Sequence, residues 1–291
     1  MRLRKASELS VEATAYSSRL PEAPYDGIAA AYRDWWAPVL APVAVRLLDR
    51  VDGLLSTDWR GTLVDVGTGT GTLALAALRR WPRARVIGVD PASRLLQVAE
   101  TTALDAGLQN RLTTKVGKAA SLPLPDACVD AAVSSFVIQL TPSRAAALRE
   151  AMRVLRPGGV FACLTWRAHE DPIEPGKGLD DALGALGIER PHAQPRRDRP
   201  YTSPTSAAAE LRRAGFRSVR AREEWLEHRF TPQSYLDLAE HWIDDDVFAD
   251  LDEPMRRRLR TEALRRLETL RPDDLVWRRP LVSAVGTVGE D

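Results

Sequence analysis

Three glycines at alternate positions follow a short apolar run in the stretch TLVDVGTGTGTLAL, residues 62–75. Glycine adopts left-handed backbone conformations without strain, and it lets another group approach the main chain closely. The run TLVDV is short, rich in β-branched residues and bounded by glycine on both sides. We therefore expect a buried strand, a sharp turn, and a helix from about Gly71 to Trp81, which a proline ends.

The same alternation of strand and helix continues along the chain. RVIGVD (85–90), RLTTKV (111–116) and VDAAVSSFV (129–137) have strand patterns, and residues 93–106 have a helical pattern. This spacing is typical of an α/β fold with a parallel sheet and helices on both faces. Ligands of such sheets bind at the carboxyl ends of the strands. Four residues are expected there: Gly67, Asp90, Lys118 and Ser134.

Proline and glycine set the other expected boundaries. Residues 28–56 have a helical pattern, and we expect interruptions at Pro38 and Pro42. A further helix is expected to start with Thr141 as its cap, and the segment RPGG (156–159) is expected to form a turn before the next strand.

Composition limits the class of partner. The 291 residues include 41 basic and 40 acidic side chains, so the formal net charge is +1 and no overall field attracts nucleic acid or an anionic membrane. No run of about 18 apolar residues and no signal-peptide core occurs. The two cysteines, Cys128 and Cys163, give neither a disulfide framework nor a metal site. We expect a cytoplasmic protein, monomer or homodimer, that binds a small molecule.

The glycine spacing restricts the nucleotide. A dinucleotide fingerprint requires a third glycine where Thr72 stands, and a phosphate loop requires a lysine that is absent from this turn. Asp90 ends the strand pattern VIGVD, 19 residues after Gly71, where a carboxylate can accept protons from both hydroxyls of a ribose. A bare tight turn and a helix cap would explain the two features separately. Their combination favours a nucleoside without phosphates.

Four segments resemble, in order and spacing, the class I S-adenosylmethionine-dependent methyltransferases: LVDVGTGTGTLAL, VIGVDPA, VGKAASLPLPDACVDAAVSSFVIQL and EAMRVLRPGGVFACLTW. The chain looks closest to the small-molecule branch that includes the ubiquinone and menaquinone biosynthesis methyltransferases, over about residues 28–166. The resemblance implies a Rossmann-like sheet with helices on both faces, an N-terminal helical segment and a helical cap inserted before the last strand. It also implies S-adenosylmethionine as cofactor and S-adenosylhomocysteine as product.

The resemblance assigns the cofactor contacts. Asp65 would orient the glycine loop and the methionine ammonium, Asp90 would hold the ribose, and the turn at Lys118 and Ala119 would meet the adenine. Relatives usually carry Asp in place of Lys118, whose ammonium donates hydrogen bonds and accepts none, so we expect this side chain to turn to solvent. The complete set of expected contacts is Tyr32, Asp65, Gly67, Thr68, Gly69, Gly71, Asp90, Pro91, Lys118, Ala119, Ala120, Ser134 and Ser135.

Candidate catalytic residues are few, because methyl transfer from a sulfonium needs alignment and exclusion of water more than a strong base. Tyr32, Trp35 and Trp36 are candidates to hold the cation over an aromatic face, and packing on the core is the alternative. We favour Tyr32. His169 and His241 are candidates for a base toward an acidic hydroxyl, and for either histidine a solvated or capping role is the alternative that outweighs catalysis.

The resemblance also shapes the expected domain organisation. We predict one catalytic domain over residues 1–291, in which residues 169–204, rich in Pro, Gly and charge, form a mobile lid or linker with a short helix in DDALGALG. The other expected parts are an N-terminal helical cap, a cofactor-binding half and a C-terminal half with a helical insertion: 1–60, 61–168, 205–291 and 231–272.

Three functions are compatible with these features. The first is O-, N- or C-methylation of a small molecule, an aromatic or polyketide-like acceptor of secondary metabolism. The second is a nucleic-acid methyltransferase, which the neutral charge disfavours; SSFV also stands where amino-group methylating enzymes of this fold carry Asn/Asp-Pro-Pro-aromatic. The third is a cyclase or other catalyst that retains the fold and the cofactor without methylating.

Overall fold

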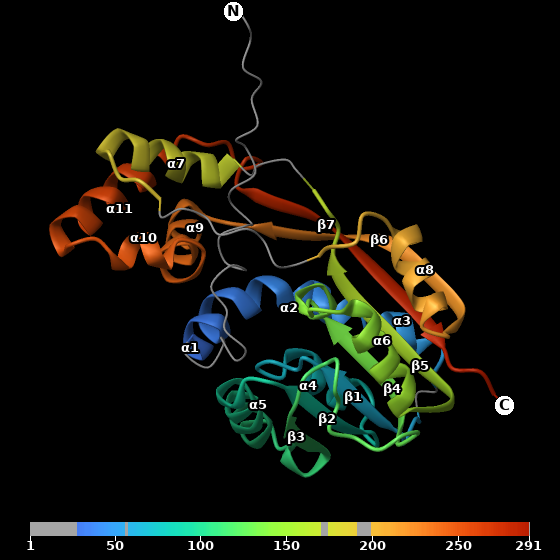
Figure 1. Cartoon of the computed structure of the whole chain (residues 1–291). Helices are drawn as coiled ribbons and strands as arrows, with labels where there is room; N and C mark the ends of the chain where they lie inside the picture. Colours follow the sequence, from blue (N-terminus) through green and yellow to red (C-terminus); the bar gives the residue numbers. More distant parts are fainter. Residues whose placement is uncertain (1–27, 56–57, 170–173, 191–198, 291) are drawn as a thin grey trace, which may run out of the picture. The chain divides into compact units, whose positions relative to one another are not determined.

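The computed structural model describes residues 28–55, 58–169, 174–190 and 199–290 (Figure 1). They form two compact units, which we call the sheet unit and the helical unit. Within the described ranges, the sheet unit takes residues 28–168, 199–225 and 280–290, and the helical unit takes 169–190 and 226–279.

Seven strands form one sheet in the order β3-β2-β1-β4-β5-β7-β6. In chain order the strands are β1 (Thr62–Val66), β2 (Arg85–Asp90), β3 (Leu112–Val116), β4 (Val129–Ser135), β5 (Leu155–Trp166), β6 (Arg217–Arg229) and β7 (Val276–Thr287). The pairs among β1 to β5 are parallel, as expected. β7 runs antiparallel to β5, so the sheet is mixed, because the strand–helix alternation of the first half does not extend to this strand.

One face of the sheet is covered by α6 (Arg144–Val154) and α8 (Pro204–Arg213). Buried residues of both helices, including Leu148 and Leu211, pack with residues of the strands such as Val64, and the rings of Phe161 and Phe216 stack with their centroids 5.2 Å apart. The residues of β1 alternate in direction, so Leu63 and Asp65 face away from this cluster. Val64 thus belongs to the core on this face, and the Asp65 side chain lies on the opposite face of β1, the face of the glycine turn.

The opposite face carries the N-terminal helices together with α4 (Thr72–Arg80) and α5 (Ser93–Asp105), which contact β2. The N-terminal elements are α1 (Ala29–Ala31), the π-helix η3 (Tyr32–Trp36), α2 (Ala37–Arg46) and α3 (Asp49–Asp52). Pro42 does not interrupt α2, contrary to expectation. It lies on the exposed side of the helix, where water can reach the carbonyl that lacks an N–H partner.

Two boundaries around α6 also differ from the expectation. Ser143 caps the helix by accepting a hydrogen bond from the N–H of Ala146 at 3.2 Å, whereas the hydroxyl of Thr141 donates to the carbonyl of Ile138 in the short helix η5 (Ile138–Leu140). The segment RPGG is part of β5 and forms an irregularity, because its pairing with β4 shifts between Val129 and Ala131. A further short helix, η4 (Gln109–Arg111), precedes β3.

The helical unit holds α7 (Glu174–Leu186) and the helices between β6 and β7. These are α9 (Pro232–Leu238), the π-helix η6 (Ala239–Ile243), α10 (Asp245–Ala249) and α11 (Glu253–Leu267) (Figure 1). Helices α9 and α11 contact α7 and each other, and η6 contacts α9 and α10. The helix expected in DDALGALG is thus longer and begins at residue 174. Among the described residues, no helix is long and apolar enough to cross a bilayer, and no group of His, Cys, Asp or Glu is arranged to hold a metal ion.

The start of α8 provides a test of the local fold. Ser203 and Ser206 form a reciprocal capping box, in which the Ser203 hydroxyl accepts from the Ser206 N–H at 3.1 Å. Ser203→Ala should lower the free energy of unfolding by about 1 kcal/mol, a fall in Tm of roughly 2–4 °C for a protein of this size. Thr205→Ala, at an exposed neighbouring position, is the matched control for thermal unfolding. Equal stability of the Ser203 and Thr205 variants would contradict the assigned cap.

Candidate active site

The turn between β1 and α4 is built from three glycines with different tasks. All three have positive φ: Gly67 (+77°), Gly69 (+54°) and Gly71 (+85°). A Cβ on Gly67 would lie 2.1 Å from the Val137 side chain, and one on Gly71 would lie 2.9 Å from Ala99 Cβ. A Cβ on Gly69 would meet the ring of Tyr32 at an ordinary 3.7 Å. Gly67 and Gly71 are therefore required by packing inside the protein, whereas at Gly69 a Cβ would meet no close contact.

Asp90, at the end of β2, holds this turn in place. Its Oδ2 accepts a hydrogen bond from the N–H of Gly69 at 2.9 Å, and its Oδ1 accepts one from the N–H of Ala92 at 2.9 Å, at the start of α5. Ala92 is itself the N-cap of α5 and no side chain caps this helix, so Asp90 fixes the residue before the first turn without capping it. Each carboxylate oxygen has a further lone pair, so these bonds leave acceptor capacity for ligand hydroxyls.

Asp65 is a buried carboxylate with an unusual proton affinity. It lies in β1 beside Gly88 and Val133, is 1% exposed, and accepts a hydrogen bond from the Thr68 hydroxyl at 2.8 Å. Burial raises the pKa of Asp65 to about 7, the hydrogen bond from Thr68 opposes this rise, and the negative charge of Asp90 adds to it. Within the described residues, no ion pair compensates this carboxylate.

Tyr32 comes from the π-helix η3 and packs against the buried residues Ala29, Ala92 and Leu95. Burial, followed by the charges of Asp90 and Asp65, holds the pKa of its phenol well above the usual value, so Tyr32 stays protonated. Of the three aromatic candidates before β1, it is the one that lines the pocket.

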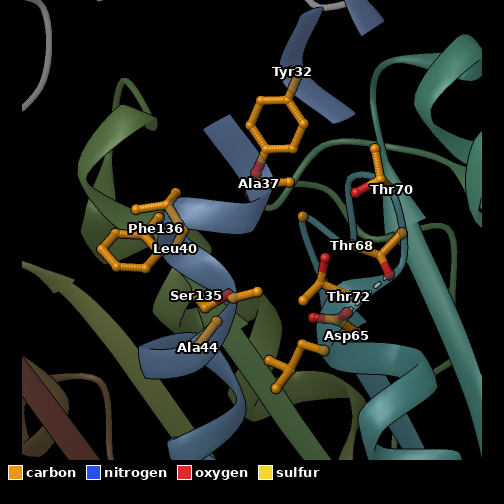
Figure 2. A pocket seen from close by; sticks show the side chains of 13 residues that line it. Tyr32, Ala37, Leu40, Ala44, Asp65, Thr68, Thr70, Thr72, Ser135 and Phe136 are labelled. Atoms are coloured by element: carbon orange, nitrogen blue, oxygen red, sulfur yellow. Dashed lines mark hydrogen bonds between the residues drawn. The ribbon is translucent and has the colours of Figure 1, made fainter. Parts of the chain in front are cut away.

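An open pocket lies above the glycine turn, and the space between its walls is about 370 Å³, part of which is open to solvent. Figure 2 shows a polar wall of Asp65 and threonines after β1, an apolar wall from α2 and the end of β4, and Tyr32 at one end. The lining residues are Tyr32, Ala37, Leu40, Ala41, Ala44, Asp65, Gly67, Thr68, Thr70, Thr72, Leu73, Ser135 and Phe136.

Phe136 is a pocket residue that the sequence reasoning missed. Its backbone φ is +57°, its N–H donates to the carbonyl of Leu164 at 2.8 Å, and its ring centroid lies 4.8 Å from that of Trp166. A left-handed conformation at a residue with a Cβ costs about 1–2 kcal/mol, so the surrounding contacts hold it there. The sequence pattern placed Phe136 inside a strand over residues 129–137, where a single Phe in an apolar run is typical of the core, whereas β4 ends at Ser135.

The two serines before Phe136 separate, because neighbouring residues of a strand point to opposite faces. Ser134 is fully buried, and its hydroxyl donates to the carbonyl of Val66 at 2.9 Å inside the sheet. Ser135 lines the pocket. The structure thus gives Ser134 a role in strand pairing and leaves Ser135 as the candidate for ligand contact.

The remaining expected cofactor contacts lie beyond β2 and β3 and outside the pocket lining. Lys118 is exposed, and its carbonyl accepts a hydrogen bond from the N–H of Ser121 at 3.0 Å, which closes the turn that carries Ala119 and Ala120. Asp126, a conceivable partner for Lys118, pairs with Arg153 at 2.6 Å. Pro91 is half-buried directly after Asp90.

Both candidate histidines belong to the helical unit, and neither is among the residues that line the pocket. His241 is exposed on η6, where its Nδ1 lies 2.8 Å from the carbonyl oxygen of Asp237. His169 is half-buried.

The pocket is suited to a cationic nucleoside. Asp65 lines it with a desolvated carboxylate. Asp90 and Gly69, bonded to each other at 2.9 Å, are not among the lining residues; they meet at the glycine turn and contribute carboxylate acceptors and a backbone without a side chain. A ligand cation beside Asp65 would offset the burial of its charge. The residues present therefore fit the cofactor that the sequence implies.

Comparison with known proteins decides the family. A model described as a methyltransferase domain matches residues 64–163. Nocamycin O-methyltransferase of Saccharothrix syringae is 30% identical over 250 residues, which cover 80% of this chain and 85% of that protein. The chain belongs to the class I S-adenosylmethionine-dependent methyltransferases.

Two further proteins are similar to this methyltransferase, one in sequence over part of the chain and one in structure over nearly all of it. The ubiquinone/menaquinone biosynthesis C-methyltransferase UbiE of Syntrophotalea carbinolica is 37% identical over 116 residues, 40% of this chain and 48% of that protein, so the match spans less than half of that relative. The crystal structure of the cyclase SpnF has a TM-score of 0.57 at 19% identity and covers 95% of this chain and 99% of that one. At this level of identity, the similarity to SpnF shows that the two chains share a fold.

The unequal tasks of the glycines lead to a prediction. Gly67→Ala should destabilise the methyltransferase more than Gly69→Ala, because its Cβ would overlap the Val137 side chain, whereas the Gly69 variant carries mainly the left-handed strain of about 1–2 kcal/mol. Adding Val137→Ala to Gly67→Ala should restore part of the lost stability. Denaturant unfolding of the four proteins measures this, and equal stability of the two single variants would contradict it.

Asp65 leads to a second prediction, about stability without cofactor. A free Asp titrates near pH 3.9, whereas Asp65 titrates near 7 in the folded chain. The folded state therefore binds more protons in between, and stability falls as the pH rises from about 4 to about 7 and stays low above it. Asp65→Asn should raise the free energy of unfolding at pH 8 by about 2–4 kcal/mol, the equivalent of such a shift, with little difference near pH 4. If Asp65→Asn were less stable than the unaltered protein by the same amount at pH 4 and at pH 8, the claim that Asp65 is a buried charge at pH 8 would be contradicted.

Proposed function

We propose that this methyltransferase transfers the methyl group of S-adenosylmethionine to a small-molecule acceptor. The observation that carries the proposal is the buried Asp65 carboxylate, which faces a pocket with no compensating cation among the described residues. The proposed cofactor carries an ammonium and a sulfonium. A site that keeps an unpaired carboxylate at the cost of stability is suited to such a ligand.

The chain's residues divide the binding task by chemistry. Asp65 would hold the ammonium, Asp90 would accept the ribose hydroxyls while it keeps Gly69 in place, and the turn of Lys118 and Ala119 would meet the adenine. When bound, S-adenosylmethionine supplies a methyl group on a sulfonium, and transfer leaves S-adenosylhomocysteine. Pro91, Ala120 and Ser135 complete the proposed contacts near these groups.

The apolar wall would protect the reacting atoms from water. Leu40, Ala44 and Phe136 present hydrocarbon surface to the pocket, and the protonated Tyr32 adds an aromatic face and a hydrogen-bond donor at one end. Such a wall aligns an acceptor without supplying a base. His169 or His241 is proposed as the base where the acceptor has an acidic hydroxyl.

The nature of the acceptor is proposed from the relatives. Nocamycin O-methyltransferase, similar over most of its length, bears the name of a small-molecule product, and this supports an aromatic or polyketide-like acceptor of secondary metabolism. A cyclase that retains the fold is the second candidate, because SpnF shares the fold over 95% of this chain. A nucleic-acid acceptor is disfavoured by the net charge of +1.

Labelled cofactor separates these functions. The protein is incubated with S-adenosylmethionine labelled in the methyl group and with a metabolite extract, RNA or DNA in parallel, and Gly69→Val serves as the variant with a blocked pocket. We expect label in the small-molecule fraction, none in nucleic acid, and none with the variant. Calorimetry should give one S-adenosylhomocysteine per chain for the unaltered protein. Cofactor binding without transfer would favour the cyclase, and unchanged binding by the variant would overturn the assigned pocket.

A further inference from the structure

The chain between β3 and β4 contains a three-residue turn over residues 122–124, which we call the proline turn. The N–H of Leu124 donates to the carbonyl of Leu122 at 2.8 Å, which closes the turn around Pro123. Both leucines are buried in the core on the α6 face of the sheet, whereas Pro123 is exposed. The proline turn is therefore anchored by its two flanking side chains.

Pro123 packs directly against Gly117. A Cβ on Gly117 would lie 2.5 Å from Cδ and 2.8 Å from Cγ of Pro123, so the proline ring occupies the space that a side chain would need. The N–H of Gly117 donates to the carbonyl of Asp90 at 3.1 Å, and Gly117 directly precedes Lys118. The position of Pro123 therefore restricts where the turn of Lys118 and Ala119 lies.

Two side chains of α6 bind the main chain of the proline turn. Oε2 of Glu150 accepts a hydrogen bond from the N–H of Leu122 at 2.8 Å. Arg153 donates from Nη1 to the carbonyl of Leu124 at 2.8 Å and from Nη2 to the carbonyl of Leu122 at 3.2 Å. Main-chain groups on both sides of Pro123 are thus held by one helix.

Glu150 and Arg153 also hold each other. Arg153 Nε lies 2.8 Å from Oε1 of Glu150, and Nη2 lies 2.8 Å from Oε2, so the pair is joined at two points. The hydrogen bond from Arg153 holds the pKa of Glu150 below its ordinary value, and burial opposes this effect. Because a guanidinium presents its donors in one rigid plane, the pairing fixes the direction of the donors that reach the carbonyls. The further pair with Asp126 contributes little, since the Asp126 side chain is 79% exposed.

We propose that Glu150 and Arg153 are positioning residues for the adenine end of the cofactor site. The inference rests on the proposed function, in which the turn of Lys118 and Ala119 meets the adenine. Neither side chain lines the pocket, and both act through the proline turn. Groups that recognise a ligand must be held within about 0.5 Å of the productive geometry. The pair therefore sets how well the protein distinguishes adenine from a base with a different edge.

Calorimetry on the full chain with two ligands tests this role. The ligands are S-adenosylhomocysteine and S-inosylhomocysteine, in which an oxygen replaces the amino group of adenine. We expect the unaltered protein to bind the adenosyl compound more tightly. Arg153→Gln removes the donors to both carbonyls. It should weaken binding of the adenosyl compound up to about tenfold, the effect of one lost hydrogen bond, and that of the inosyl compound much less, so the ratio of the two affinities falls.

Arg80→Gln is the matched control. Arg80 also binds two carboxylates, those of Asp49 and Asp52, at 2.7 Å each, and its side chain is 31% exposed against 30% for Arg153. Arg80 lies at the end of α4 and binds no part of the proline turn within the described structure. The control should lower the thermal stability and leave the affinity ratio unchanged, because a purely structural loss affects both ligands alike.

Pro123→Ala is the second variant, at an exposed position that tolerates substitution. It removes the ring contact with Gly117, keeps the ion pair on α6, and should lower the same affinity ratio. An unchanged ratio in both Arg153→Gln and Pro123→Ala, or an equal fall in Arg80→Gln, would overturn the positioning role. Failure of the unaltered protein to bind either compound would instead overturn the proposed function on which this role rests.

Discussion

The burial of the Asp65 carboxylate beside Asp90 is the interaction on which the rest of the site depends. Both residues stand at the carboxyl ends of neighbouring parallel strands, so the fold itself brings two negative charges together. The turn between them can pass because glycine takes positive φ, and the Gly69 N–H binds Asp90 while the Thr68 hydroxyl binds Asp65. Two polar groups of the turn thus bind the two carboxylates, while the N–H groups of Gly67 and Thr68 donate to the carbonyl of Val89.

A second buried acid in the chain shows what is unusual about Asp65. In the helical unit, burial raises the pKa of Asp244 to about 6, but Arg190 Nε lies 3.0 Å from its Oδ1 and opposes the rise. Asp244 therefore has an internal counter-ion, as buried charges ordinarily do. Asp65 has hydrogen bonds and no such cation among the described residues, so its charged form is uncompensated and lowers the stability of the fold.

Much of the sheet unit could be predicted from local signals. The apolar run and the glycines located β1 and its turn, and RVIGVD coincides with β2, because a strand between charged or glycine-rich segments has few alternatives. The start of α8 also carries a local signal, because Pro204 directly follows the capping residue Ser203. Asp65 and Tyr32 were expected in the site from family resemblance, and the structure places both in the pocket lining.

The parts that could not be predicted depend on contacts between distant segments. The left-handed backbone of Phe136 is fixed by Leu164 and Trp166, which no local pattern reveals. The packing reasons for Gly67 and Gly71 lie at Val137 and Ala99, so sequence alone treated three glycines as equivalent ligand contacts. The direction of β7 follows from its pairing with β5, since single strands carry no signal of orientation.

Proton release on cofactor binding is the most direct test of this account. Near pH 7, Asp65 is about half protonated in the free protein, and a bound cation would drive it to the charged form. Calorimetric titration with S-adenosylmethionine in buffers of different ionisation enthalpy should detect release of about half a proton per chain. Asp65→Asn should bind more weakly and release none of it. The same proton release from both proteins, or none from the unaltered protein, would contradict the claim that Asp65 receives the cofactor's positive charge.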